Sequence, residues 1–111
     1  MKIKLYDLPK LSLNKWYAGV HWTKRKKIKD TYKLIIDNQY KEVLSKENKY
    51  VVEYVFNFKS RPLDASNCVA MAKLIEDVIF EDDKWNIVTS INIKSVKSDT
   101  EYVCINVKIL T

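Results

Sequence analysis

A chain of 111 residues, 47% of them hydrophobic, is long enough for one domain with a modest core. No apolar run approaches the length of a membrane span, and the opening MKIKLYDL alternates charged with apolar residues, unlike a signal peptide, so we expect a cytoplasmic protein without a membrane segment. The formal net charge of +6 favours a polyanionic partner, for which nucleic acid is the natural candidate.

The cysteines and the histidine exclude two kinds of stabilising site. Cys68 and Cys104 fall within a predicted helix and a predicted strand, which suits reduced, buried thiols better than a disulfide. One histidine and no paired cysteine motif are too few soft ligands for structural zinc. His21 stands beside Trp22, and we interpret it as a packing residue, with a catalytic role as the alternative.

The chain begins with a predicted strand and a predicted loop. Residues 2–8 form a short strand that Pro9 ends, because proline lacks a backbone donor. Residues 11–22 contain Gly19 and several rings, and they predict a loop held in place by ring packing. The alternative for these rings is a surface on which bases or sugars stack.

A long helix is predicted after this loop. Thr23 is its expected N-cap, and apolar side chains recur at near-helical spacing at Ile28, Tyr32, Ile35, Ile36, Val43 and Leu44. Its first turns carry a basic cluster of Lys24, Arg25, Lys26, Lys27 and Lys29. The helix macrodipole makes cations unfavourable there, so the charges either fan out into water or contact a phosphate backbone.

The second half of the chain predicts three strands and one helix. Residues 46–49 form a polar turn, and residues 50–58 are rich in β-branched and aromatic side chains typical of a central strand. Residues 86–97 and 101–110 alternate apolar and polar side chains, and residues 97–100 between them predict a hairpin turn. We therefore expect an α/β (α+β) fold over residues 1–111, in the order strand, helix, strand, helix, strand, strand, with two helices packed on a mixed sheet.

The helix within residues 61–85 carries the candidate chemistry. Its apolar stripe consists of Cys68, Met71, Ile75, Val78 and Ile79, and its polar stripe consists of Ser66, Ala70, Lys73 and Asp77. Asp64 precedes the first turn, where its carboxylate could accept free amide protons. A run of acids, Glu81, Asp82 and Asp83, follows the helix in a predicted turn.

Carboxylates beside a lysine permit two interpretations. Metal-dependent phosphodiester chemistry needs acids to ligate Mg²⁺ or Mn²⁺ and a cation to neutralise phosphate charge. The alternative is that Lys73 and Asp77 form an ordinary surface pair one helical turn apart and that the acids of residues 81–83 are a solvated turn.

Three short motifs in this order resemble the RusA-type Holliday-junction resolvases, which are small homodimeric endonucleases common in phages and prophages. Ser12 and Asn14 lie in SLNKWY, Asp64 and Asn67 lie in LDASN, and Asp82 and Asp83 lie in EDDKW. The order of elements is similar along nearly the whole chain. The chain departs from the family pattern at Ser66, where a second aspartate is expected, and at Ala70, where a lysine is expected.

The resemblance implies a metal-dependent endonuclease that resolves branched double-stranded DNA as a homodimer. Asp64 and Asp83 would ligate Mg²⁺ or Mn²⁺, with Asp82 or a water in place of the missing acid, and Lys73 would neutralise phosphate. The residues expected to contact DNA are Lys24, Arg25, Lys26, Lys27, Arg61, Asn14 and Asn67. Two alternatives remain open, namely a DNA-binding relative that does not cut and an unrelated basic scaffold protein.

Overall fold

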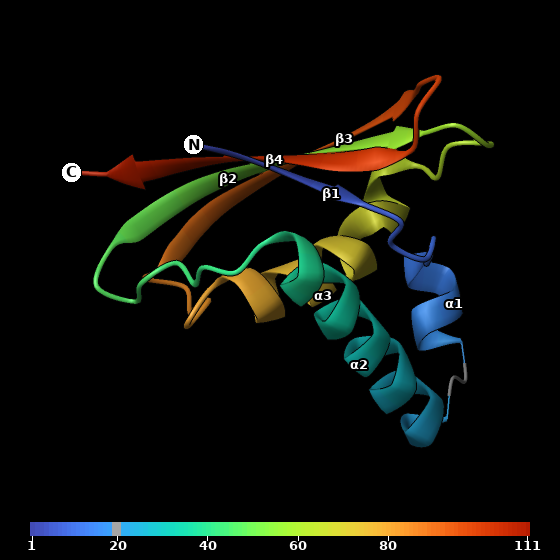
Figure 1. Cartoon of the computed structure of the whole chain (residues 1–111), viewed down its shortest axis with the longest axis horizontal. Coiled ribbons are helices and arrows are strands. Elements are labelled where there is room, and N and C mark those ends of the chain that lie inside the picture. The colour runs from blue at the N-terminus through green and yellow to red at the C-terminus, as the bar shows by residue number, and fades with distance from the viewer. Residues whose placement is uncertain (19–20) are drawn as a thin grey trace.

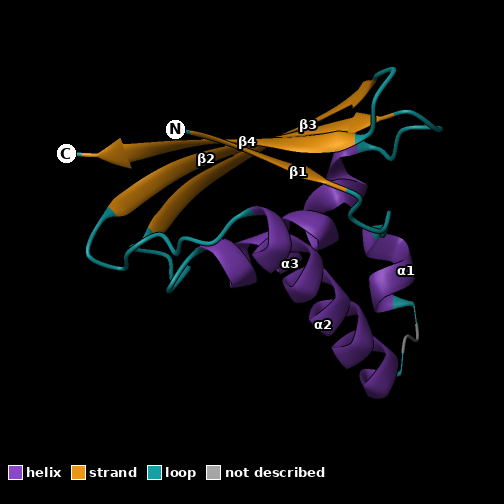
Figure 2. Cartoon of the chain, in the orientation of Figure 1, coloured by secondary structure: helices purple, strands orange, loops and turns teal. Residues whose placement is uncertain are grey.

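A four-stranded mixed sheet carries all the helices on one of its faces in the computed structural model, which describes residues 1–18 and 21–111 (Figure 1, Figure 2). The strands are β1 (Lys2–Tyr6), β2 (Lys49–Phe58), β3 (Val88–Lys97) and β4 (Tyr102–Leu110). Their order is β1-β4-β2-β3, with β2 and β3 parallel and the other pairs antiparallel. The predicted mixed sheet and the α+β class are confirmed.

The helices are α1 (Leu13–Tyr17), α2 (Trp22–Gln39), the 3₁₀ turn η1 (Ala65–Cys68) and α3 (Val69–Ile79). The prediction of a loop over residues 11–22 is therefore wrong for α1, since the Ser12 side chain accepts a hydrogen bond from the Lys15 amide and starts a short helix. Gly19, on which part of that prediction depended, lies outside the described residues. The described residues thus contain one more α-helix than expected.

The predicted limits of the long helix are also wrong at both ends. His21, not Thr23, is the N-cap of α2, and its Nδ1 accepts a hydrogen bond from the Thr23 amide. The helix ends at Gln39, whose side chain bonds both the amide and the carbonyl of Tyr6 at 2.7 Å. This contact fixes the end of α2 to the edge strand β1, so the chain leaves in an extended conformation before Val43, which is 61% exposed.

The alternation of each strand divides the sheet into a buried face and an open face. On β2, Tyr50, Val52, Tyr54, Phe56 and Phe58 all point inward and are buried. Their partners across β4 and β1 are equally apolar, and α2 and α3 cover them to form one continuous core. Burial on this scale contributes roughly 25 cal/mol for each Å² of apolar surface removed from water.

The predicted hairpin between the last two strands is wrong, because β2 lies between β3 and β4. The connecting residues 98–101 cross the end of β2, where the Ser98 amide donates to the Phe58 carbonyl at 2.8 Å. The strongly apolar β2 gains pairing partners on both sides in this arrangement. The more polar β3 is left at the edge, where most of its side chains are exposed.

The expected helix in residues 61–85 is present, and its apolar stripe faces the core. Cys68, Met71, Ile75 and Ile79 are buried, and Val78 is half-buried. Asp64 occupies the N-cap position, but its side chain makes no capping hydrogen bond, and its backbone carbonyl instead accepts from the Asn67 amide. Within the described ranges, no helix combines the length and apolar content that a membrane crossing requires.

Candidate acidic site and basic surface

Lys73 on α3 is held between two carboxylates. Its ammonium group lies 3.3 Å from Asp77, one turn further along the helix, and also donates to Asp83 in the turn after the helix. Burial alone would lower the pKa of Lys73, but the hydrogen bonds and negative charges of Asp83 and Asp77 raise it overall. The chain therefore does return Asp83 to the side of α3, where it meets Lys73 instead of Asp64.

A buried carboxyl group lies next to this cluster and was missed from the sequence. Glu76 is 7% exposed, and its Oε1 accepts a hydrogen bond of 2.9 Å from the Tyr54 hydroxyl. Burial raises the pKa of Glu76, the Tyr54 hydrogen bond lowers it, and the charge of Asp83 raises it further. A signal was available, because Glu76 falls on the same stripe as Ile75 and Ile79, where a polar side chain needs a buried partner.

The other acid of the DD motif serves the local turn. Asp82 is half-buried, its Oδ1 accepts from the Lys84 amide at 3.1 Å, and its second oxygen lies 3.5 Å from the Lys84 ammonium. Glu81 similarly accepts from the Lys46 amide at 3.0 Å. Glu81 and Asp82 thus serve the turn that follows the helix, as the alternative interpretation of these acids expects.

The residues of the LDASN motif lie at the opposite end of the helix from Asp83. Asp64 and Ser66 are exposed, and Asn67 is half-buried. Asp64 lies near Cys68 and helps to raise the pKa of its thiol, to which burial contributes more. Between Asp64 and Lys73, η1 and the first turn of α3 span about 14 Å along the helix axis.

These positions do not fit a divalent ion held by three side chains of one chain. Across residues 1–18 and 21–111, the structure contains no group of three or more His, Cys, Asp or Glu side chains that could hold a metal. Asp83 is neutralised by Lys73, and Ala70, at the motif position where a lysine was expected, is buried in the core. A divalent ion shared by Asp64 and Asp83 stays a prediction. Because the two residues lie at opposite ends of the helix, a second copy of the chain would have to supply one of these carboxylates.

The predicted DNA contacts divide into exposed and engaged side chains. Lys24 and Lys27 are exposed on α2, whereas Lys26 pairs with Asp30 at 3.0 Å. Arg25 lies 5.2 Å from the Trp16 ring and donates to the Trp16 carbonyl at 2.8 Å, so it fastens α1 to α2. Of the rings predicted to hold this segment in place, Trp16 packs against the core, whereas Tyr17 and Trp22 are 70% and 69% exposed.

The remaining predicted contacts lie near the entrance of α3 and on α1. Asn14 and Arg61 are exposed, and the Arg61 carbonyl accepts a hydrogen bond from Lys10. Lys10 and Lys15 line a surface hollow together with Ser12 and Leu63. Two lysines thus lie at the SLNKWY motif. His21 is an exposed helix cap whose ring lies 5.8 Å from that of Trp22, so it packs beside an exposed ring and not in the core.

A groove between α2 and α3 joins the basic helix to the acidic cluster. Lys29, Asp30 and Lys33 line one side of it, and Leu74, Asp77 and Val78 line the other. Lys33 also pairs with Asp37 at 3.0 Å along α2. Asp77 therefore lines the same groove as two lysines while it shares Lys73 with Asp83. The arrangement places cations next to carboxylates on an open surface.

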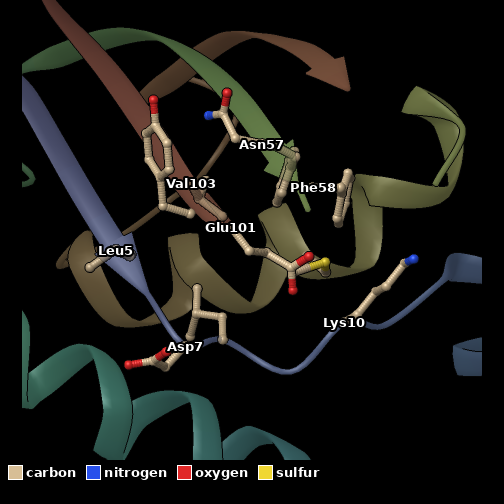
Figure 3. A pocket seen from close by; sticks show the side chains of 11 residues that line it. Leu5, Asp7, Lys10, Asn57, Phe58, Glu101 and Val103 are labelled. Carbon is tan, nitrogen blue, oxygen red and sulfur yellow. The ribbon is translucent and has the colours of Figure 1, made fainter. Parts of the chain in front are cut away.

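A partly open hollow lies on the helix side of the sheet between β1, β2, β4 and α3 (Figure 3). Its lining includes Leu5, Phe58, Met71 and Val103, and its space is about 10 Å³, which is room for about one water molecule. A small organic substrate does not fit there. The surface grooves are therefore the better candidates for a functional site.

No family model matches the chain, and no curated protein matches it. The resemblance to RusA-type resolvases therefore stays a prediction that depends on the three short motifs.

Both cysteines are free thiols, with Cys68 buried and Cys104 half-buried.

Proposed function

We propose that this protein acts on branched double-stranded DNA as a structure-specific endonuclease of the RusA type, and that two copies form the working unit. The observation that supports it best is the groove between α2 and α3, where Lys29 and Lys33 lie opposite Asp77. Phosphates held by the lysines would lie beside the carboxylates that share Lys73. Such an activity requires access to DNA, so we expect the protein in the cytoplasm of a bacterium or an infected cell.

Binding of the DNA backbone is the first part of the proposal. The chain has a net charge of +6, and exposed lysines at the start of α2 continue towards the groove. Lysines that displace counterions from phosphates give affinity without reading the base sequence. Recognition of a branch would then depend on how two basic surfaces are placed in a dimer.

Cutting is the second part, and it comes from the resemblance together with the cluster at Lys73. Mg²⁺ or Mn²⁺ is the cofactor that the resemblance implies, but one chain does not gather three ligands for it within the described ranges. A two-fold dimer could present Asp64 of one copy to Asp83 of the other, which would also place two equivalent sites on two strands.

A junction-binding protein that does not cut is the second candidate. Two observations favour it, namely that Asp83 is already neutralised by Lys73 and that Ala70 is only 4% exposed. Lysine in place of Ala70 would bury a charge in the core, so this position cannot simply regain the residue that the family pattern has.

A synthetic four-way junction tests the two candidates together. The protein is incubated with labelled junction and with linear duplex of the same length, without metal and with Mg²⁺ or Mn²⁺. We expect tighter binding to the junction than to the duplex, and symmetrical cuts only when metal is present. The Asp83→Asn variant controls for a contaminating nuclease, because it should bind but not cut.

The outcomes separate the candidates clearly. Junction binding without cuts under any metal would favour the binding protein over the enzyme. Equal affinity for junction and duplex would contradict branch recognition. Absence of salt-sensitive DNA binding would overturn both candidates and leave the basic scaffold.

A further inference from the structure

The sheet has a second face that none of the described helices covers. These helices all lie on the opposite side, as Figure 2 shows. Along the open face, none of the outward side chains of the strands is buried, in contrast to the apolar inner rows. From β1 to β3 one row reads Lys4, Cys104, Val55 and Lys94, and the next reads Lys2, Asn106, Glu53 and Asn92.

This open face is positively charged. Its cations are Lys2, Lys4, Lys49, Lys94 and Lys108. The acid among these outward strand positions, Glu53, lies 3.2 Å from Lys94 and accepts from Asn106 at 2.9 Å. Those hydrogen bonds from Lys94 and Asn106 lower the pKa of Glu53, so it stays ionised and cancels one lysine only. The remaining lysines give this face a net positive charge that suits a negatively charged partner.

A pair of aromatic rings lies at one end of the same face. Tyr6 and Tyr102 are cross-strand neighbours whose ring centroids are 5.5 Å apart with 28° between the planes. Lys4 Nζ lies 5.7 Å from the centroid of the Tyr102 ring. Tyr6 is 41% exposed, so part of this stack is open to solvent. A lysine beside exposed rings on a sheet is an arrangement on which unpaired bases stack while phosphates meet the cation.

Amide side chains continue the row from the tyrosines. Asn57 is the cross-strand neighbour of Tyr102, and Asn106 and Asn92 flank Glu53 in another row. Amides both donate and accept, so they suit the polar edges of bases. Duplex DNA hides its base faces, whereas a single strand offers faces, edges and phosphates together.

We propose that the open face of the sheet, defined by Lys2, Lys4, Tyr6, Tyr102, Asn57 and Lys108, binds single-stranded nucleic acid. A second copy of the chain is a poorer occupant, because face-to-face pairing would bring like-charged lysines together. A membrane surface would use the lysines but has no bases for the tyrosine stack. This surface is separate from the groove between α2 and α3, so a protein that fails to cleave DNA would not contradict this second proposal.

The test uses a fluorescent oligo(dT) strand and a duplex of equal length, with affinity measured by anisotropy over a range of NaCl concentrations. Alanine at both Tyr6 and Tyr102 should weaken binding of the single strand by about 5- to 150-fold for each base that stacks. Duplex affinity should change less than about two-fold. Tyr17→Ala is the matched control, since Tyr17 is 70% exposed but belongs to α1 on the helix side.

Further variants keep the proposal testable if the alanine protein fails to fold. Phenylalanine at Tyr6 and Tyr102 preserves the rings and should retain affinity for the single strand. Alanine at Lys4 and Lys108 should lower the salt slope on a single strand by about 0.7 for each phosphate that the protein no longer neutralises.

Several results would overturn it. These are no binding of oligo(dT) at low salt, unchanged affinity in both the tyrosine and the lysine variants, or an equal loss in Tyr17→Ala. An equal loss for duplex and single strand would assign the face to duplex DNA instead. Conversion of a dimer to a monomer by the tyrosine variants would assign the face to a second copy.

Discussion

The hydroxyl of Tyr54 on the central strand donates a 2.9 Å hydrogen bond to Oε1 of Glu76 on α3, which joins the sheet to the helix through a polar contact inside the core. Burial raises the pKa of Glu76 above its ordinary value even though the Tyr54 hydrogen bond opposes this. A raised pKa means that folding favours the protonated form. The stability from Glu76 is therefore complete at low pH and is lost as the pH rises through its folded pKa.

Glu76→Gln should remove this pH dependence. Glutamine keeps the size and can still accept from Tyr54, but it does not ionise. The difference in free energy of unfolding between the variant and the wild type should therefore favour the variant more at pH 8 than at pH 4. Urea unfolding at pH 4, 6 and 8 measures the difference. Glu47→Gln is the control, because Glu47 is exposed. The same pH profile in wild type and Glu76→Gln would contradict the role of burial.

Asp83→Asn should separate cutting from binding. The Lys73 side chain is 58% exposed in its pair with Asp83, so loss of this ion pair should cost less than about 1 kcal/mol of stability. Junction cleavage should disappear, while DNA binding should stay or tighten because one negative charge is removed beside Lys73, which keeps its pair with Asp77. Gel assays of binding and cleavage measure both, with Asp99→Asn as a surface control. Full cleavage by Asp83→Asn would contradict the site.

Mixing two inactive variants tests whether two copies share one site. Asp64→Asn and Asp83→Asn should each be inactive as pure proteins. If Asp64 of one copy works with Asp83 of the other, a mixed dimer contains one intact site and should nick one strand of the junction. Refolding the two together before the cleavage assay allows exchange. Cleavage by both pure variants would rule out the site. A mixture that has exchanged subunits and still does not cut the junction would rule out a site shared between two copies.

The basic start of α2 should set the salt dependence of duplex binding. Alanine at Lys24 and Lys27 should reduce the slope of log affinity against log salt by about 0.9 for each phosphate that the protein no longer neutralises. Arg25 is left out, because it holds Trp16. The control replaces Lys41 and Lys46, which follow the end of α2. An unchanged slope for the Lys24 and Lys27 variant would show that these lysines are ordinary solvated surface residues that do not contact phosphates.

A homodimer is expected from the two-fold symmetry of a four-way junction. Light scattering at high protein concentration, with and without junction DNA, should give a mass near twice the 13.1 kDa of the chain. A monomer under both conditions would contradict the proposed arrangement of shared sites.

The sequence by itself determined the elements whose pattern is strong and local. The β-branched and aromatic residues of 50–58 were enough to identify β2 as a central strand, and the helical spacing from Cys68 to Ile79 was enough to identify α3 and its inward face. The surface pair between Lys73 and Asp77 also follows from spacing, since residues one turn apart are neighbours on any helix.

Only the tertiary structure decided which elements meet. Periodicity shows which face of a strand is buried but not which strand lies beside it, so β3 and β4 resemble a hairpin in the sequence although β2 separates them. The end of α2 depends on the bond from Gln39 to Tyr6, 33 residues away in the chain. Asp83 reaches Lys73, and Glu76 reaches Tyr54, for the same reason: long-range packing, which no local pattern encodes, selects each partner.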